Sequence, residues 1–264
     1  MDALKNILRQ IKLNKKAILN ISAIILLIAA SLALSLPNMQ TVFAVAKAEK
    51  RKLPIYCVDT PDKRVSISFD AAWGADDTDQ ILKILRDNDI RATFFLCGYW
   101  VTKYPEEVKK IHAEGHDIGN HGDTHAHGAE LSLEKNKAEI LGAHEKVKNL
   151  LGIDMNLFRP PYGEYNDTVI TAAEETGYYT IQWDVDSHDW MGKGVEAEVK
   201  QVLDHKHLRN GSIILFHNDA KYTPAALEII IKGLKEKGYE IVPISQLIHK
   251  DSYYMDHEGR QKLE

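Results

Sequence analysis

Two histidines four residues apart form the first candidate for chemistry in this sequence. His121 and His125 enclose Gly-Asp-Thr and follow Asp117–Asn120, the end of a predicted strand. Neutral imidazole is a preferred ligand of zinc and similar divalent ions, and side chains with this spacing can face the same way on a helical turn or in a tight loop. Such a pair also occurs in solvated polar loops. Its place after a predicted strand, with acids after neighbouring strands, favours a metal site.

Carboxylate, guanidinium and imidazole groups follow other predicted strands in the same way. Asp70 comes directly after the apolar run Val65–Phe69, where partial desolvation should raise its pKa and suit it to act as a general base. Arg159 is the natural cation to restrain it. His217 ends another apolar run and could act as a general acid if Asp189 keeps it protonated. A structural ion pair and a satisfied core histidine are the alternatives.

These groups need a scaffold that brings strand ends together. After residue 64, β-branched or aromatic runs alternate with amphipathic runs of helical period. The predicted strands are Val65–Phe69, Arg91–Cys97, His116–Asn120, Met155–Arg159, Tyr178–Trp183, Ser212–Phe216 and Tyr239–Ile244. The predicted helices are Asp77–Asn88, Pro105–Glu114, Leu133–Leu151, Asp167–Thr176, Val195–His205 and Pro224–Lys237. This alternation predicts an α/β fold with a parallel sheet, either open and doubly wound or closed into a barrel.

The polar groups gather at one end of these strands. Five of the seven predicted strands carry a charged or imidazole group at or just after the carboxyl end. Barrel enzymes assemble their active sites at that end, and open α/β sheets bind ligands there. The asymmetry predicts a catalytic face.

Composition narrows the class of protein. Apolar residues make up 44% and charged residues 27%, with a net charge of −5, which indicates a globular domain and no basic surface for nucleic acid. The two cysteines, Cys57 and Cys97, are too few for a disulfide scaffold. Cys97 lies in an apolar run, which favours a buried free thiol, although the two could pair in an oxidising compartment. The sequence indicates no particular oligomeric state.

The first 48 residues differ from the rest. Five basic residues and one acid occupy residues 1–16, and residues 17–46 carry no charge. About 20 apolar residues can cross a bilayer, and preceding basic residues favour a cytoplasmic N-terminus. Small residues at 44–48 fit a signal peptidase site, yet the run is longer than the usual signal-peptide core. Residues 1–48 are therefore predicted to be a signal peptide or a membrane anchor, with a buried core helix as the alternative. The protein is expected to be exported, either membrane-anchored or secreted.

No internal linker divides the remainder of the chain. Residues 49–64 are expected to form a linker and the start of the domain, and residues 65–250 a single domain. Residues 251–264 are expected to be a polar, loose tail.

Five motifs in order carry a family resemblance. They are Phe69-Asp70, His121-x-x-x-His125, Arg159-Pro160-Pro161-Tyr162-Gly163, Asp186-Ser187-His188-Asp189-Trp190 and Leu215-Phe216-His217. Over residues 65–247 the sequence resembles the polysaccharide deacetylases (NodB-homology proteins, carbohydrate esterase family 4). With its Phe-Asp-Ala-Ala-Trp-Gly stretch behind a membrane-targeting segment, it is similar to the sporulation-associated deacetylases of Gram-positive bacteria.

The resemblance implies a distorted (β/α) barrel with seven or eight strands, here preceded by an N-terminal membrane-targeting helix. It also implies an enzyme that removes acetyl groups from N-acetylhexosamine units of a cell-wall glycan, either peptidoglycan or a chitin-like polymer. A divalent metal, zinc or cobalt, would polarise the acetyl carbonyl and lower the pKa of a bound water. His121 and His125 would bind that metal.

The resemblance also assigns roles to residues of this chain. Asp70 would be the base, held by Arg159, and His217 would be the acid, tuned by Asp189. The backbone N–H of Tyr162 would face the oxyanion. The acetyl pocket would be formed by Pro161, Trp190 and Leu215.

One departure from the family pattern bears on the metal. The first motif normally has two consecutive aspartates, of which the second binds the metal, and here that position is Ala71. The site could keep two histidines and water, recruit Asp76 or Asp77, bind metal weakly, or use Asp70 as a ligand and leave the base role vacant. Two main functions stay open, an active deacetylase and a non-catalytic glycan-binding relative that has lost its metal site. A metal-dependent hydrolase of another amide or ester is a third.

Overall fold

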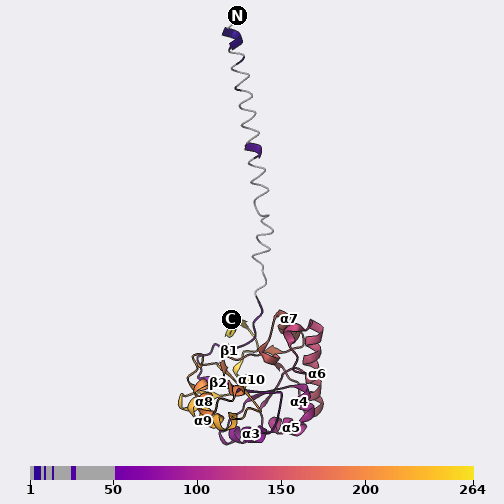
Figure 1. Cartoon of the computed structure of the whole chain (residues 1–264), viewed down its shortest axis with the longest axis vertical. Helices are drawn as coiled ribbons and strands as arrows, with labels where there is room; N and C mark the ends of the chain where they lie inside the picture. The colour runs from indigo at the N-terminus through magenta and orange to yellow at the C-terminus, as the bar shows by residue number, and fades with distance from the viewer. Residues whose placement is uncertain (1–2, 7–8, 10–13, 15–24, 28–50) are drawn as a thin grey trace. The chain divides into compact units, whose positions relative to one another are not determined.

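The computed structural model describes residues 51–264 and, before them, residues 3–6, 9, 14 and 25–27. Most of the predicted signal peptide or anchor, including the small residues at 44–48, lies outside the described residues. Among the residues that are described, no helix is both long enough and apolar enough to cross a bilayer. Arg51–Glu264 form one compact unit (Figure 1).

Strands within residues 51–264 are short and regularly spaced along the chain. They are β1 (Cys57–Val58), β2 (Arg64–Ala71), β3 (Thr93–Leu96), β4 (Asp117–Asn120), β5 (Leu157–Phe158), β6 (Tyr179–Thr180), β7 (Val185–Asp186), β8 (Ile213–His217), β9 (Glu240–Ile241), β10 (Tyr253–Met255) and β11 (Arg260–Leu263).

Helices alternate with these strands. They are α3 (Thr78–Asp87), α4 (Gly98–Lys103), α5 (Pro105–Ala113), α6 (Leu133–Leu151), α7 (Asp167–Glu175), α8 (Val195–Leu203), α9 (Thr223–Glu236) and α10 (Ile244–Leu247). Capping explains the bounds of α6, which begins after Ser132, whose hydroxyl accepts a bond from the Lys135 N–H, and ends at Gly152 with φ 74°.

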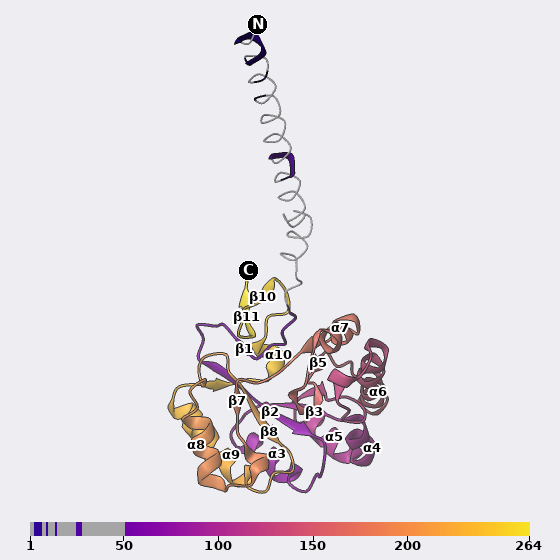
Figure 2. The same ribbon diagram turned by 45° about the horizontal axis from the view of Figure 1, so that its top comes forward.

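The main sheet of the unit 51–264 has eight strands in the order β6-β5-β4-β3-β2-β8-β7, with β9 paired to the start of β2. Every pairing in it is parallel. Helices surround these strands, with α8 packed on α9 at one side and α4 packed on α6 at the other (Figure 2). The arrangement matches the predicted distorted (β/α) barrel, with β6 and β7 at the two ends of the strand order.

Alternation along β2 sorts its side chains into two layers. Val65, Ile67, Phe69 and Ala71 belong to the large apolar cluster shared with the helices. The Phe69 ring stacks on Phe94 of β3, with 4.8 Å between centroids, and lies 5.7 Å from the Phe216 ring of β8. The polar residues between them, Ser66, Ser68 and Asp70, therefore point to the other face of the sheet, inside the barrel.

The expectation of a loose tail at residues 251–264 is wrong. Strand β10 pairs antiparallel to β11, and β11 pairs parallel to β1. Gln261 is fully buried, where its side chain accepts from the His249 N–H and donates to the His249 carbonyl. Backbone pairing between strands holds this segment in place. Because it has no continuous apolar face, its sequence resembles that of a loose polar tail.

Four further helices and strands were not predicted, and both cysteines are free. Helices α4 and α10 have only six and four residues, and strands β1 and β7 only two each, which is too short for a clear periodic pattern. Cys57 and Cys97 are unpaired and buried, so the buried free thiol is confirmed and the disulfide alternative is wrong.

Candidate active site

A pocket of about 760 Å³ opens where strands of the main sheet end. Predicted site residues from five different segments line it: Asp70, His121, His125, Tyr162, Asp189, Trp190, Leu215 and His217. Arg159 is fully buried behind the pocket wall, and Pro161, expected to line the acetyl pocket, is buried and not part of the lining. Parallel strands place their carboxyl ends on one edge, which is why residues far apart in sequence meet here.

Arg159 holds the carboxylate of Asp70 in a fixed orientation. Its Nη1 donates to Asp70 Oδ1 at 2.7 Å, and its Nη2 donates to Ser68 Oγ at 2.9 Å. The guanidinium also lies over the Phe95 ring, 4.1 Å from the centroid. One oxygen of Asp70 is thus tied to the cation, and the other, Oδ2, lies 3.5 Å from His121 Nε2.

The pKa of Asp70 is shifted in the direction opposite to the prediction. Burial raises the pKa of this carboxyl, but the charges of Arg159, His121 and His217 and the hydrogen bond from Arg159 lower it by more, so the pKa lies below its ordinary value. The prediction named Arg159 as the restraining cation but gave desolvation the larger effect on the pKa. With the Arg159 guanidinium bound to it, Asp70 is an ionised acceptor over the neutral pH range.

The two histidines present neutral imidazoles to the pocket. His121 Nδ1 lies 2.7 Å from the Arg159 carbonyl oxygen, so Nδ1 carries the proton and the Nε2 lone pair is free. Burial lowers the pKa of His121, and it lowers that of His125 to about 4, with His121 as the next cause. The rings lie 5.0 Å apart. Neutral imidazoles with free nitrogens are suited to metal binding.

Hydrogen bonds from α6 hold the loop that carries these histidines. Glu139 Oε2 accepts from the backbone N–H groups of Asp123 and Thr124 at 3.0 and 2.8 Å, and Oε1 accepts from the Thr124 hydroxyl. At the start of the loop, Asn120 Oδ1 accepts from the Gly122 N–H. The sequence analysis did not identify Glu139, because nothing local marks it as a partner of residues fifteen positions earlier.

The chemistry of the available donors fits a divalent ion. In the described part of the chain, one atom each from Cys97, His121 and His125 forms a group whose members all lie within 4.8 Å of one another. Asp76 and Asp77 belong neither to this group nor to the pocket lining. Two imidazole nitrogens and a sulfur are ligands typical of zinc and similar ions.

His217 is held by Asp189 in the same way that Asp70 is held by Arg159. His217 Nδ1 lies 2.7 Å from Asp189 Oδ1, and Thr223 Oγ1 donates to Asp189 Oδ2 at 3.0 Å. Burial lowers the pKa of His217, but the hydrogen bond and charge of Asp189, together with the charge of Asp70, raise it by more. The imidazolium form is favoured, as a general acid requires.

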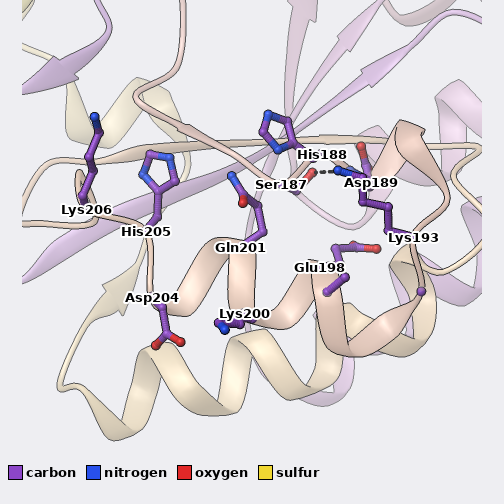
Figure 3. A pocket seen from close by; sticks show the side chains of 12 residues that line it. Ser187, His188, Asp189, Lys193, Glu198, Lys200, Gln201, Asp204, His205 and Lys206 are labelled. Atoms are coloured by element: carbon purple, nitrogen blue, oxygen red, sulfur yellow. Dashed lines mark hydrogen bonds between the residues drawn. The ribbon is translucent and has the colours of Figure 1, made fainter.

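A second pocket, of about 540 Å³, is lined by Asp189 together with Ser187 and Glu198 (Figure 3). The Asp189 N–H donates to Ser187 Oγ at 3.3 Å. Glu198 of α8 is buried in the same wall, and its burial and the charge of Asp189 raise its pKa to about 7. The sequence analysis did not single out Glu198.

Exposed aromatic side chains surround the main pocket. Trp73, Tyr162 and Trp190 are each more than half exposed, at 57%, 52% and 61%. Tyr162 has a left-handed backbone, with φ 60°, inside the short turn Pro161–Gly163. Strained backbone of this kind is often found at active sites, where it points a backbone group toward a ligand. Trp73, which contacts the His125 ring, was not predicted as a site residue.

This arrangement defines the class of protein: a (β/α) barrel with an acid–base pocket at the carboxyl ends of its strands. Residues 58–181 match the family model of the polysaccharide deacetylases. A peptidoglycan-N-acetylglucosamine deacetylase of Bacillus cereus is 38% identical over 196 residues, which covers 72% of this chain and 91% of that protein. The peptidoglycan-N-acetylmuramic acid deacetylase PdaA of Bacillus subtilis is 30% identical and covers 73% of this chain and 74% of its own length.

Solved structures agree with these relatives. A CE4 family pseudoenzyme of Bacillus anthracis has a TM-score of 0.71 at 30% identity, covering 75% of this chain and 69% of that one. A peptidoglycan N-acetylglucosamine deacetylase has a TM-score of 0.70 at 31% identity, covering 74% of this chain and 92% of that one. The chain belongs to the polysaccharide deacetylase family, the NodB-homology proteins of carbohydrate esterase family 4, a family of hydrolases that cleave amide bonds.

Proposed function

We propose that this protein is an exported, metal-dependent N-deacetylase that removes acetyl groups from N-acetylhexosamine units of peptidoglycan. The observation that carries the proposal is the complete pair of proton-transfer groups in one pocket. Asp70 is held ionised by Arg159, and His217 is held protonated by Asp189. A binding protein needs the groove but has no need for a tuned base and a tuned acid in it.

The substrate class is supported by the relatives and by the rim of the pocket. Two relatives are named for peptidoglycan, one for its N-acetylglucosamine and one for its N-acetylmuramic acid. The exposed rings of Trp73, Tyr162 and Trp190 offer flat apolar faces against which sugar rings can stack. Leu215 is the apolar residue in the lining suited to the acetyl methyl group.

The side chains of this chain would divide the reaction between them. When bound by His121 and His125, a divalent ion supplies Lewis-acid chemistry that polarises the acetyl carbonyl and makes water more acidic. Asp70 accepts the proton of the attacking water through its free oxygen. The Tyr162 N–H donates to the oxygen of the amide carbonyl as negative charge develops. His217 gives its proton to the sugar nitrogen as the carbon–nitrogen bond breaks, which releases acetate and a free amine.

The experiment that tests this proposal measures acetate release and metal content together. The purified full-length chain, loaded with zinc or cobalt, is expected to release acetate from peptidoglycan of vegetative cells or spores, with acetylated chitooligosaccharide as the competing substrate. A variant with His121 and His125 both changed to Ala should lose metal, measured by emission spectroscopy after dialysis, and lose activity with it.

The second candidate is a non-catalytic glycan-binding relative, which Ala71 and the pseudoenzyme neighbour favour. It predicts retained glycan binding with no acetate from any substrate, with or without metal. That outcome would overturn the deacetylase proposal.

Export by residues 1–48 is part of the proposal. The uncharged run at 17–46 after a basic start supports it, as does a substrate outside the cell membrane. Cell fractionation of the full-length protein should place it in the membrane or the medium, and finding it only in the cytoplasm would contradict this part.

A further inference from the structure

Cys97 lies beside both histidines and next to the strand that ends at Ala71. Strands β2 and β3 pair in parallel, with Ala71 opposite Leu96, and the Cys97 N–H donates to the Ala71 carbonyl oxygen at 3.1 Å. The thiol donates to the carbonyl oxygen of His121 at 3.3 Å. The backbone of Cys97 is thus next to the end of β2, and its thiol is next to the first histidine.

Sulfur and imidazole nitrogens form a compact group at this place. Cys97 Sγ and one ring nitrogen each of His121 and His125 all lie within 4.8 Å of one another. In a tetrahedral zinc site, metal–ligand distances of about 2.0–2.3 Å place neighbouring ligand atoms about 3.3–3.6 Å apart. The three atoms are therefore at most about 1.5 Å farther apart than the ligand atoms of such a site. Three protein ligands and one open position are the usual set of a catalytic zinc site.

The direction of approach also suits a catalytic ion. Cys97 is fully buried and does not line the pocket, whereas His121 and His125 do. A sulfur ligand on the protein side would leave the pocket side of the ion open to water and to the acetyl group. Asp70, the other nearby anion, is already bound to Arg159 through Oδ1.

We propose that Cys97 is the third metal ligand of this protein, replacing the carboxylate that is absent at Ala71 and giving a site of two imidazoles and one thiolate. The inference rests on the proposed metal dependence and specifies its donor set. It predicts a metal site that differs in chemistry from one built of an aspartate and two histidines.

Cobalt spectroscopy of the full-length protein tests the proposal independently of activity. A thiolate bound to Co²⁺ gives an intense charge-transfer band in the near ultraviolet, which nitrogen and oxygen ligands do not give. We expect this band in the cobalt-loaded wild type and in the control Cys57→Ala, which removes the other buried thiol. Cys97→Ala and Cys97→Ser should lack the band. Their affinity for cobalt should fall by more than about tenfold, because even the loss of a residue that only hydrogen-bonds a metal ligand lowers metal affinity by about that factor.

A rescue variant separates loss of a ligand from loss of the fold. Ala71→Asp in the Cys97→Ala background should restore cobalt affinity without restoring the band. Cobalt bound to the wild type without the band, or full affinity in Cys97→Ala, would overturn the role of Cys97 and leave the proposed deacetylase intact. If the wild type binds neither cobalt nor zinc, the metal dependence and the role of Cys97 both fail.

Discussion

Both the imidazole ring and the backbone N–H of His217 form hydrogen bonds with the carboxylate of Asp189. The His217 ring nitrogen Nδ1 lies 2.7 Å from Asp189 Oδ1, and the His217 backbone N–H donates to Asp189 Oδ2 at 2.6 Å. The ring and the end of β8 are therefore oriented by one buried carboxylate. A general acid held in this way has a fixed position and an elevated affinity for its proton.

The first prediction concerns the basic limb of the pH–activity profile. The net effect of burial, which lowers the pKa of His217, and of Asp189, which raises it, is a pKa above the ordinary 6.5. His217 donates a proton, so activity should fall as the pH rises through this elevated pKa. Asp189→Asn should move the basic limb of kcat/KM toward lower pH, and His217→Ala should reduce kcat by about 10²–10⁴-fold. A basic limb that does not move in Asp189→Asn would show that another group sets it.

The second prediction concerns the buried ion pair. Asp70 and Arg159 are both buried, so removal of one partner leaves the other charge without compensation. Arg159→Ala should lower the free energy of unfolding by about 3–5 kcal/mol, measured by denaturant titration. Asp70→Asn should abolish nearly all turnover, since the amide cannot accept the proton of water.

A matched control is Ser68→Ala, which removes a hydrogen bond from the same guanidinium and the hydroxyl's own bond to the Ile214 carbonyl oxygen, but leaves Asp70 paired with Arg159. It should cost about 2 kcal/mol and leave kcat close to that of the wild type. If Arg159→Ala cost no more than Ser68→Ala, the pair would not be a major source of stability.

The third prediction concerns the loop between the two histidines. Because Glu139 binds the N–H groups of Asp123 and Thr124, Glu139→Ala should loosen the loop and weaken metal affinity by about 10–100-fold. The neighbouring change Glu145→Ala, on the same helix but outside the loop contacts, serves as the control. Isothermal titration with zinc measures both. Equal affinities in the two variants would mean that the histidines hold their positions without Glu139.

The fourth prediction concerns stability in acid. Burial, with a smaller effect from Arg91, lowers the pKa of His116 from 6.5 to about 4, and its Nδ1 accepts a bond from the Ala92 N–H. Folding favours the neutral ring, so its contribution is fully present above pH 6.5 and is lost as the pH falls toward 4. The loss in the free energy of unfolding should reach about 3 kcal/mol, because each unit of difference in pKa corresponds to about 1.4 kcal/mol.

His116→Asn keeps an acceptor for the Ala92 N–H but does not titrate. Denaturant titrations between pH 7 and 4 should therefore show a shallower fall in unfolding free energy for this variant. Parallel curves for wild type and variant would contradict the shift in the pKa of His116.

Local patterns in the sequence were enough to predict most elements and most of the residues around the pocket. Helix α6 has the predicted bounds, Leu133–Leu151, because its cap residues Ser132 and Gly152 and its apolar period are all local signals. Asp70, His121 and His217 were predicted to share a site because each follows a predicted strand, and parallel strands end on a common edge.

Only the tertiary structure decided the features that depend on partners distant in sequence. The pKa of Asp70 is lowered because Arg159, 89 residues later, and the two imidazoles outweigh its desolvation, which was all the local sequence could show. Residues 251–264 are ordered by pairing with β1, more than two hundred positions earlier, so no local pattern marks them as strands. From its own strand, Cys97 was interpreted as a buried core residue. Its thiol comes close to His121 and His125 only when β3 and β4 pair side by side. The sequence alone determines the type of each side chain, whereas the folding of the whole sheet determines its neighbours and its electrostatic environment.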